Sequence, residues 1–484
     1  MEEKNKVFSG LIWRFLERFG AQIVSFIISI VLARLLDPNV YGVIAIVTVF
    51  ITILQVFVDS GLGTALIQKK DADDLDFSSV FYANIVLCVL LYTVLFFFAP
   101  LIAKFYAIPE LTLIIRVMGI AILISALKNI QQAYVSRKMM FKKFFFATLG
   151  GTIGAAIVGI SLAVSGFGVW ALVAQNLFNL TTDTIILWVT VKWRPKKMFS
   201  FKRLKKLFSY GVHILTAALI DTIYKNLRSL VIGKVYSTED LAYYSKGQKF
   251  PELAIVNVNA SIDSVLLPSM SNENAKIEKV RSMTRRSIKL TTYIIFPIMV
   301  GLAVCAEPLV LIFLTAKWLP AVFYIRIFCF TFALYPIHTA NLNAIKALGK
   351  SRTYLILEII KKVVGLSLLF STMWISVKAM AYSLLLMSII SQFINAFPNK
   401  KLLNYSFKDQ ASDIFPNVCI ALLMGFAVFC LGRADLNSYI LLPIQVITGV
   451  VLYILLSKLL QNENLEYATN LIKGIFTKKH ANKK

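Results

Sequence analysis

The chain has 484 residues, of which 58% are hydrophobic and only 16% charged, and its mean hydropathy is +0.73. A soluble protein of this length needs far more polar surface, so the composition excludes that class and indicates a polytopic membrane protein. The formal net charge of +26 would suit a nucleic-acid partner, unless the cations lie in short loops between membrane spans.

Apolar stretches of roughly 20 residues recur along the chain, each long enough to cross ~30 Å of hydrocarbon as a helix. We predict an all-α fold of about fourteen transmembrane helices. In chain order, they are expected near residues 9–35, 40–66, 77–103, 110–136, 144–165, 167–191, 207–234, 239–268, 287–316, 319–347, 352–376, 378–397, 412–432 and 438–460. We expect the first helix to be retained rather than cleaved as a secretion signal, because it is long, carries Arg14, Glu17 and Arg18, and lacks a small-residue cleavage site.

Lysine and arginine gather in alternate links, whereas the opposite links carry only isolated cations such as Lys104, Lys234 and Arg433. The basic links and termini contain Lys4, Lys6, Lys69, Lys70, Arg137, Lys138, Lys142, Lys143, Lys192, Arg194, Lys196, Lys197, Lys202, Arg203, Lys205, Lys206, Lys276, Lys279, Arg281, Arg285, Arg286, Lys346, Lys350, Arg352, Lys400, Lys401, Lys408, Lys473, Lys478, Lys479, Lys483 and Lys484. This asymmetry follows the positive-inside rule and predicts that both termini are cytoplasmic. The net charge therefore reports topology, with a secondary attraction to anionic lipids, and gives no support to nucleic-acid binding.

Some sequence patterns suggest catalysis or metal binding, but their positions and spacings do not fit either function. Residues 344–351, AIKALGKS, fit a relaxed nucleotide-loop pattern, but they join two membrane helices and position 344 is alanine. The three histidines, His213, His338 and His480, have no metal-ligand spacing, and the five cysteines have no paired spacing. We therefore expect a protein that is not an enzyme and that uses neither a metal nor an organic cofactor.

Charged residues inside the first span are candidate functional residues, because a charge in hydrocarbon is costly and usually faces protein or water. Arg14 and Arg18 are four residues apart and share one helix face, and Glu17 can reach Arg14. Snorkelling of both arginines to the cytoplasmic interface is the simpler alternative.

A second charged face is predicted in the seventh span. Asp221, Lys225 and Arg228 are spaced by four and three residues, which puts two cations and one carboxylate deep in the membrane. Lys249 lies in the eighth span, and Asp59 lies near the end of the second. The alternative for Asp221 and Lys225 is a structural ion pair one helical turn apart.

Weak internal similarity at an offset of 200 residues indicates a duplication. Phe8 and Ser9 recur as Phe208 and Ser209. We predict two six-helix lobes in the same orientation, as in transporters built from parallel repeats. The predicted division is 1–200 for the N-terminal lobe, 201–405 for the C-terminal lobe, 406–461 for two added helices and 462–484 for a basic cytoplasmic tail. The basic link 192–206 would then be the hinge between the lobes.

Several segments carry a resemblance to a known family. They are LARLLDPNVYG (32–42), DSGLGTALIQ (59–68), FYANIVL (81–87), APLIAKFY (99–106), LLPSMS (266–271) and NAIKALGKS (343–351). In these segments the chain resembles the Wzx-type flippases of lipid-linked oligosaccharides, of the lipopolysaccharide, colanic-acid or teichuronic-acid exporter type. Their superfamily includes the multidrug and toxin extruders.

The resemblance implies a V-shaped pair of six-helix lobes that works by alternating access. It also implies a multi-pass protein of the bacterial cytoplasmic membrane that passes undecaprenyl-diphosphate-linked repeat units to the outer leaflet. This function agrees with the buried cations, since guanidinium groups match phosphate oxygens through paired donors. We therefore expect the substrate to be bound by Arg14, Arg18, Lys225, Arg228 and Lys249.

Coupling to H⁺ or Na⁺ is expected at Asp59 or Asp221, with Glu17 as a further charge-pair candidate. The expected partners are the lipid-linked oligosaccharide, membrane lipids, and the polysaccharide polymerase and glycosyltransferases of the same pathway. Two other functions stay open. A multidrug or cation extruder of the same fold would use acidic groups such as Asp59 and Asp183. A membrane polysaccharide polymerase is less well supported, because every predicted outward link is short.

Overall fold

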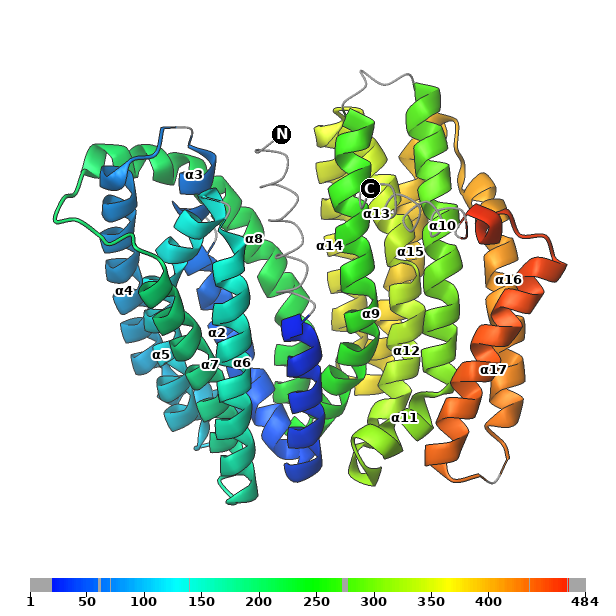
Figure 1. The fold of residues 1–484 in the computed structure, drawn as a ribbon, viewed down its shortest axis with the longest axis horizontal. Helices are drawn as coiled ribbons and strands as arrows, with labels where there is room; N and C mark the ends of the chain where they lie inside the picture. Colours follow the sequence, from blue (N-terminus) through cyan, green and yellow to red (C-terminus); the bar gives the residue numbers. More distant parts are fainter. Residues whose placement is uncertain are drawn as a thin grey trace, which may run out of the picture. The chain divides into compact units, whose positions relative to one another are not determined.

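The computed structural model of the chain describes residues 20–59, 62–69, 71–138, 140–271, 277–434, 436–467 and 469, and the regular secondary structure in them is all helical (Figure 1). These residues contain no strand. Their contacts divide the chain into two compact units, Met1–Ala242 and Tyr243–Lys484. The predicted all-α membrane fold is confirmed, whereas the predicted division into lobes, added helices and tail stays a prediction.

The first unit is a bundle of long apolar helices. Its described helices are Gly20–Leu35, α2 (Pro38–Asp59), α3 (Leu62–Gln68), α4 (Asp74–Tyr106), α5 (Leu111–Arg137), α6 (Phe141–Val164), α7 (Val169–Thr190) and α8 (Phe201–Val235). Helix α9 (Thr238–Ser271) begins in this unit and continues into the second. Helix α4 packs on α5, α6 packs on α7, and α2 contacts both α5 and α8.

The second unit is arranged around one helix. Its described helices are α10 (Ile277–Val304), α11 (Ala306–Phe313), the 3₁₀ turn η1 (Ala316–Trp318), α12 (Ala321–Ala333), α13 (Tyr335–Ala347), α14 (Ser351–Thr372), α15 (Val377–Leu403), α16 (Phe407–Leu431) and α17 (Ser438–Leu459). Helix α10 contacts α12, α13 and α16, and α17 packs on α16 and α11.

Helix caps mark one end of each unit. Asp73 starts α4 with a capping box that Asp76 completes, and Ser406 starts α16 in the same way with Asp409. Both caps adjoin basic links, so we call the helix ends near residues 69–76, 193–203, 346–352 and 400–409 the basic end of their unit. The far ends of the same helices are called the opposite end.

Each predicted span overlaps a helix, or two consecutive helices, in the described residues. The predicted span 319–347 corresponds to one candidate span, Ala321–Ala347, in which Leu334 separates α12 from α13. Among the described residues, nine helices are long and apolar enough to cross a membrane, or ten if the two parts of α8, bent by 48°, form one span. A total of about fourteen spans stays a prediction.

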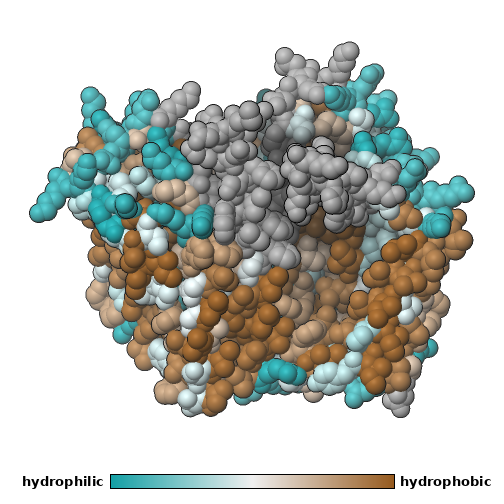
Figure 2. Space-filling model, in the orientation of Figure 1, coloured by the Kyte–Doolittle hydropathy of each residue, from teal (hydrophilic) through white to brown (hydrophobic). Residues whose placement is uncertain are grey.

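An apolar belt covers the middle of the helices. Figure 2 shows hydrophobic side chains across the visible face, with hydrophilic ones gathered mainly at the basic end. On α17, for example, Ile444, Val451 and Leu455 are each about half exposed. Side chains of this kind are stable where lipid tails cover them. The chain is therefore a multi-pass membrane protein.

The start of α2 packs closely on the start of α9. A Cβ atom on Gly42 would lie far inside van der Waals contact with the Thr238 carbonyl oxygen. Beside this contact, the Thr238 hydroxyl is hydrogen-bonded to the Asn39 side chain. Glycine at position 42 therefore permits two helix starts to touch through their backbones.

We predict that Gly42→Ala lowers the thermal stability of the detergent-solubilised protein, because the backbones must separate; overpacking of this kind costs ~1–3 kcal/mol. The matched control is Gly301→Ala in α10, where an added Cβ has no neighbour within 4 Å. The control should melt at the parental temperature or slightly above it, because alanine is the better helix former. Equal melting temperatures for Gly42→Ala and the parent would contradict the packing argument.

Candidate functional site

A polar cluster lies among α2 and α5 of the first unit. Asp59 ends α2, and its Oδ1 accepts hydrogen bonds from Asn129 Nδ2 at 3.0 Å and from Gln55 Nε2 at 3.2 Å. Asn129 Nδ2 also donates to the Val58 carbonyl oxygen at 2.6 Å, so one amide joins the end of α2 to α5. The carboxylate of Asp59 is thus held by neutral donors.

An ion pair extends this cluster to α7. Lys128 is paired with Asp183, and their side chains are only 17% and 9% exposed. The charge of Lys128 also acts on the Asp59 carboxylate. Close packing of α6 on α7 brings Asp183 into this position: a Cβ on Gly151 would lie 3.3 Å from the Asp183 backbone nitrogen. The Lys128–Asp183 pair therefore joins α5 to α7 beside the Asp59 cluster.

The predicted charged face of α8 is present. Lys225 Nζ lies 2.7 Å from Asp221 Oδ2, and these two side chains are 71% and 42% exposed. Arg228, one turn further along, is buried. The face thus combines a solvent-accessible lysine, held by its own helix, with a buried guanidinium.

Helix α9 carries two lysines in different surroundings. Lys249, a predicted site residue, is 59% exposed and lies 3.6 Å from Glu252 on the same helix. Lys246 is buried, with its ammonium 5.6 Å from the centre of the Trp318 ring. A lysine that is paired only along its own helix can exchange its carboxylate partner for another anion.

The basic link before α8 is tied to the start of α4. Arg203 Nη1 lies 2.6 Å from both carboxylate oxygens of Asp73, and Lys196 Nζ lies 2.6 Å from Asp74 Oδ2. Trp193 Nε1 also donates to Asp74, at 3.1 Å. The guanidinium of Arg203 holds the pKa of Asp73 at about 2. Because the folded pKa of Asp73 is lowered, the stabilisation from this pair is fully present above the ordinary pKa of an aspartate, and it is lost progressively as the pH falls from that value through about 2.

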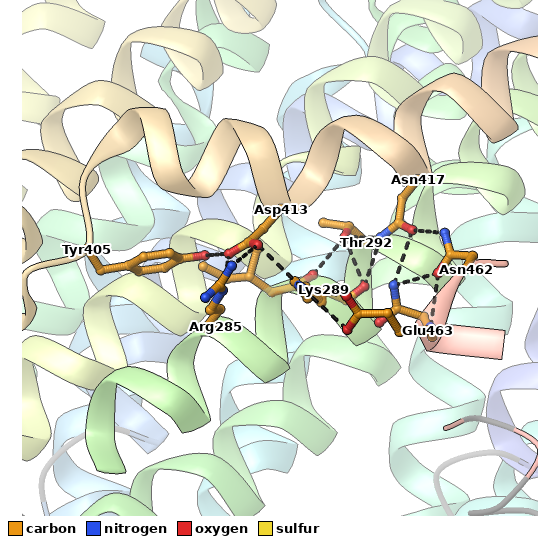
Figure 3. A network of polar contacts seen from close by, with 10 residues as sticks. Arg285, Lys289, Thr292, Tyr405, Asp413, Asn417, Asn462 and Glu463 are labelled. Carbon is orange, nitrogen blue, oxygen red and sulfur yellow. Dashed lines mark hydrogen bonds and ion pairs between the residues drawn. The ribbon is translucent and has the colours of Figure 1, made fainter. Parts of the chain in front are cut away.

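The second unit contains its own charge network at the basic end (Figure 3). Arg285 of α10 donates from Nε and Nη2 to the two oxygens of Asp413 of α16, at 2.6 and 2.7 Å. The Tyr405 hydroxyl donates to Asp413 Oδ2 at 2.9 Å, and Lys289 Nζ lies 3.4 Å from Asp413 Oδ1. Lys289 also reaches Glu463 beyond α17, at 3.3 Å. The network joins α10, α16 and the segment after α17.

A buried amide network lies beside these charges. Asn341 of α13 and Gln410 of α16 exchange side-chain hydrogen bonds, each of 2.9 Å. Gln392 and Asn399 of α15 donate to the same pair, at 3.0 and 2.7 Å. All four residues are buried, so they fix the contacts of three helices inside the second unit.

The predicted site residues fall in different places. Arg14, Glu17 and Arg18 lie outside the described residues. Asp221, Lys225 and Arg228 share a face of α8, as the spacing predicts. Lys249 lies on α9 in the second unit, and Asp59 belongs to the separate cluster of the first unit. Their binding and coupling roles stay predictions.

Sequence reasoning missed several polar partners. Lys128 was not distinguished from other residues of an apolar helix, and Arg285 was counted only among the cations that set topology. Both have partners more than 50 residues away, so no local spacing reveals the pairs. For the first pair the available signal was the carboxylate of Asp183, in a span that is otherwise mostly apolar. Asp413 gave no such signal, because it stands among other polar residues.

Residues 31–323 match the family of polysaccharide biosynthesis proteins. The chain belongs to this family. The predicted resemblance to polysaccharide exporters is thereby confirmed at the family level.

Several curated proteins are similar to this chain. The succinoglycan biosynthesis transport protein ExoT of Rhizobium meliloti (strain 1021) is 25% identical to it over 307 residues, which are 63% of this chain and 62% of ExoT. The teichuronic acid biosynthesis protein TuaB of Bacillus subtilis (strain 168) is 24% identical over 418 residues, 83% of this chain and 85% of TuaB. The lipopolysaccharide biosynthesis protein WzxC of Escherichia coli (strain K12) is 21% identical over 336 residues, 68% of this chain and 67% of WzxC. The matched part of the chain thus spans less than two thirds of ExoT but most of TuaB.

Solved structures share the fold. The lipid II flippase MurJ in an inward closed conformation aligns with a TM-score of 0.75 and 16% identity, over 93% of this chain and 98% of MurJ. An inward-facing multidrug resistance MATE family transporter aligns with a TM-score of 0.63 and 15% identity, over 81% of this chain and 98% of the transporter. The family member described here therefore has the fold of these transporters.

We predict that Asp183→Asn destabilises the protein, because it leaves the Lys128 charge buried without its nearest carboxylate; such a loss costs ~3–5 kcal/mol. The double variant Lys128→Met with Asp183→Leu should recover most of the stability, since neither charge then remains. Thermal unfolding of the purified variants measures both effects. A double variant less stable than Asp183→Asn alone would show that the pair has another role.

Proposed function

We propose that the chain is a flippase that moves undecaprenyl-diphosphate-linked oligosaccharide repeat units across the bacterial cytoplasmic membrane for surface polysaccharide synthesis. Family membership and the fold shared with solved transporters support this proposal. The main structural support for the flippase proposal is a cationic face inside an apolar fold. Arg228 is buried in α8, one turn from Lys225.

A diphosphate is the part of the substrate that these cations suit. Arginine presents paired N–H donors that match phosphate oxygens, and lysine adds a mobile point charge. Lys225 and Lys249 are exposed, and the carboxylate that each pairs with among the described residues lies on its own helix. A phosphate group can therefore replace Asp221 at Lys225, and an anion can replace Glu252 at Lys249. In this proposal Arg228 is the fixed anchor, and Arg14 and Arg18 meet the head group as it enters from the inner leaflet.

We propose that transport is coupled to H⁺ or Na⁺ through Asp59 rather than through Asp221. Asp221 is already neutralised by Lys225 at 2.7 Å. Asp59 is held by amide donors, and one of them, Asn129, is the chain neighbour of Lys128 in the pair with Asp183. Uptake of H⁺ or Na⁺ at Asp59 would therefore reset the contacts among α2, α5 and α7.

A multidrug or cation extruder is the second candidate function. The two carboxylates of the first unit favour it, because organic cations need acidic partners. Lys128 opposes it, since this lysine already neutralises Asp183 inside the same cluster. The extruder predicts that loss of the gene raises sensitivity to organic cations while surface polysaccharide stays normal.

The membrane and the partners follow from the flippase proposal. We place the chain in the cytoplasmic membrane with both termini in the cytoplasm, because the basic links then lie on the positive side. The proposed partners are the glycosyltransferases that build the repeat unit and the polymerase that consumes it.

We predict that Arg228→Gln lowers export of surface polysaccharide at least about tenfold, because it removes a charge-assisted bond to phosphate. Undecaprenyl-linked repeat units should accumulate in the membrane of the same cells. The readout is polysaccharide per cell together with mass spectrometry of the lipid extract.

The matched control is Arg352→Gln, at an exposed arginine near the start of α14. It should leave export unchanged, and both variants must reach parental protein levels in the membrane. Parental amounts of surface polysaccharide in Arg228→Gln cells would contradict the proposed role of Arg228 as the anchor for the diphosphate.

We further predict that Asp59→Asn abolishes the acceleration of transport by an ion gradient in proteoliposomes, whereas Asp221→Asn keeps it. Gradients of H⁺ and of Na⁺ are imposed separately, so the accelerating ion is identified in the parent protein. Loss of the gradient response in Asp221→Asn alone would assign coupling to α8 instead.

A further inference from the structure

A cavity of about 160 Å³ opens at the opposite end of the second unit, between the ends of α10–α12 and the pair α16–α17. Its polar lining comes from Glu307, Arg326, Arg433, Ser438 and Gln445. This volume is several times the ~30 Å³ of one water molecule, so it suits a lipid head group but not an oligosaccharide.

Arg326 is fixed at the base of this cavity. Its Nε donates to the Ala303 carbonyl oxygen at 3.2 Å, at the end of α10. Its Nη2 lies 3.9 Å from Glu307 Oε2, which is too long for a hydrogen bond. Within the described part of the chain, the guanidinium thus keeps Nη donors for a ligand, while Glu307 attracts it only through charge.

Arg433 supplies the second cation from the end of α16. Its guanidinium lies 5.2 Å from the centre of the Phe429 ring, a stacking contact that uses none of its N–H donors. Ser438 is the first residue of α17, so the positive end of that helix dipole adds to the same site. Two arginines against one glutamate leave the lining net positive.

Gln445 gives the cavity an acceptor. Its side chain is only 1% exposed, and its Nε2 donates to the Val428 carbonyl oxygen at 3.3 Å. Its Oε1 is buried and has no hydrogen-bond partner among the described residues. A buried carbonyl oxygen of this kind is satisfied by a hydroxyl or ammonium group of a ligand.

We propose that this cavity binds the head group of a glycerophospholipid, with its phosphate on Arg326 and Arg433 and its hydroxyl or ammonium group on Gln445 and Glu307. The cavity lies where the apolar helices α10, α16 and α17 end, which is the level at which bilayer phosphates lie. The lipid would join α16 and α17 to the body of the second unit. The site is separate from the residues proposed to carry the transported substrate.

The first unit offers a matched control. Arg116 of α5 donates from Nε to the Phe96 carbonyl oxygen of α4 at 3.2 Å, just as Arg326 of α12 donates to Ala303 of α10. The Arg116 guanidinium stacks on Phe96 at 4.1 Å. It thus repeats the contact of Arg326 without lining this cavity.

The test is native mass spectrometry of the full-length protein titrated with phosphatidylglycerol, phosphatidylethanolamine or phosphatidylcholine. The parent should bind one molecule of either of the first two lipids in preference to phosphatidylcholine, which lacks a hydrogen-bond donor on its head group. Arg326→Ala with Arg433→Ala should weaken that binding about tenfold or more, because charge-assisted bonds are lost. Arg116→Ala should bind as the parent does.

A milder variant covers the case in which the double variant misfolds. Arg433→Gln changes one exposed side chain at a helix end and should weaken binding several-fold. Unchanged binding in Arg433→Gln, or equal losses in Arg116→Ala, would overturn the proposal. Inorganic phosphate is added as a soluble competitor: failure to displace the lipid at millimolar concentration supports a lipid site, and displacement would assign the cavity to a free phosphate instead.

Discussion

A charge enclosed by apolar helices must be matched by another charge or by hydrogen bonds, and the described structure depends on this constraint. Lys128 and Asp183 join α5 to α7, and Arg285 and Asp413 join α10 to α16. Each pair connects helices that are far apart in sequence. Lys128 and Asp183 are both mostly buried, whereas in the second pair Asp413 is buried and Arg285 is half exposed. Loss of the partner of a buried charge is costly, whereas two apolar helix surfaces in lipid attract each other only weakly. These pairs therefore specify which helices touch.

The same constraint separates structural charges from candidate functional ones. Asp413 is held by Arg285, Tyr405 and Lys289 together, so its carboxylate is fully used by the fold (Figure 3). Lys225 and Lys249 instead take a single carboxylate from their own helix and stay mostly exposed. Pairing of this local kind holds the side chain in place while its charge stays available to a passing anion, which is what a carrier of a lipid diphosphate requires.

Much of the fold could be predicted from sequence, because the length of apolar runs and the alternation of basic links respond directly to the bilayer. The paired charges could not, since Lys128 and Arg285 find partners through tertiary contacts that no local pattern records. The i,i+4 spacing did identify the pair of Asp221 and Lys225, for the reason that one helix determines it.

The central claim is that this polysaccharide biosynthesis family member moves a lipid diphosphate between leaflets. Its most direct test is a proteoliposome assay with undecaprenyl-diphosphate oligosaccharide, in which an impermeant lectin or glycosidase counts the sugars exposed outside. The purified parent should speed the loss of the protected inner fraction, and Arg228→Gln should return the rate to that of protein-free vesicles. A parent protein that leaves this rate unchanged but exports organic cations from the same vesicles would contradict the account.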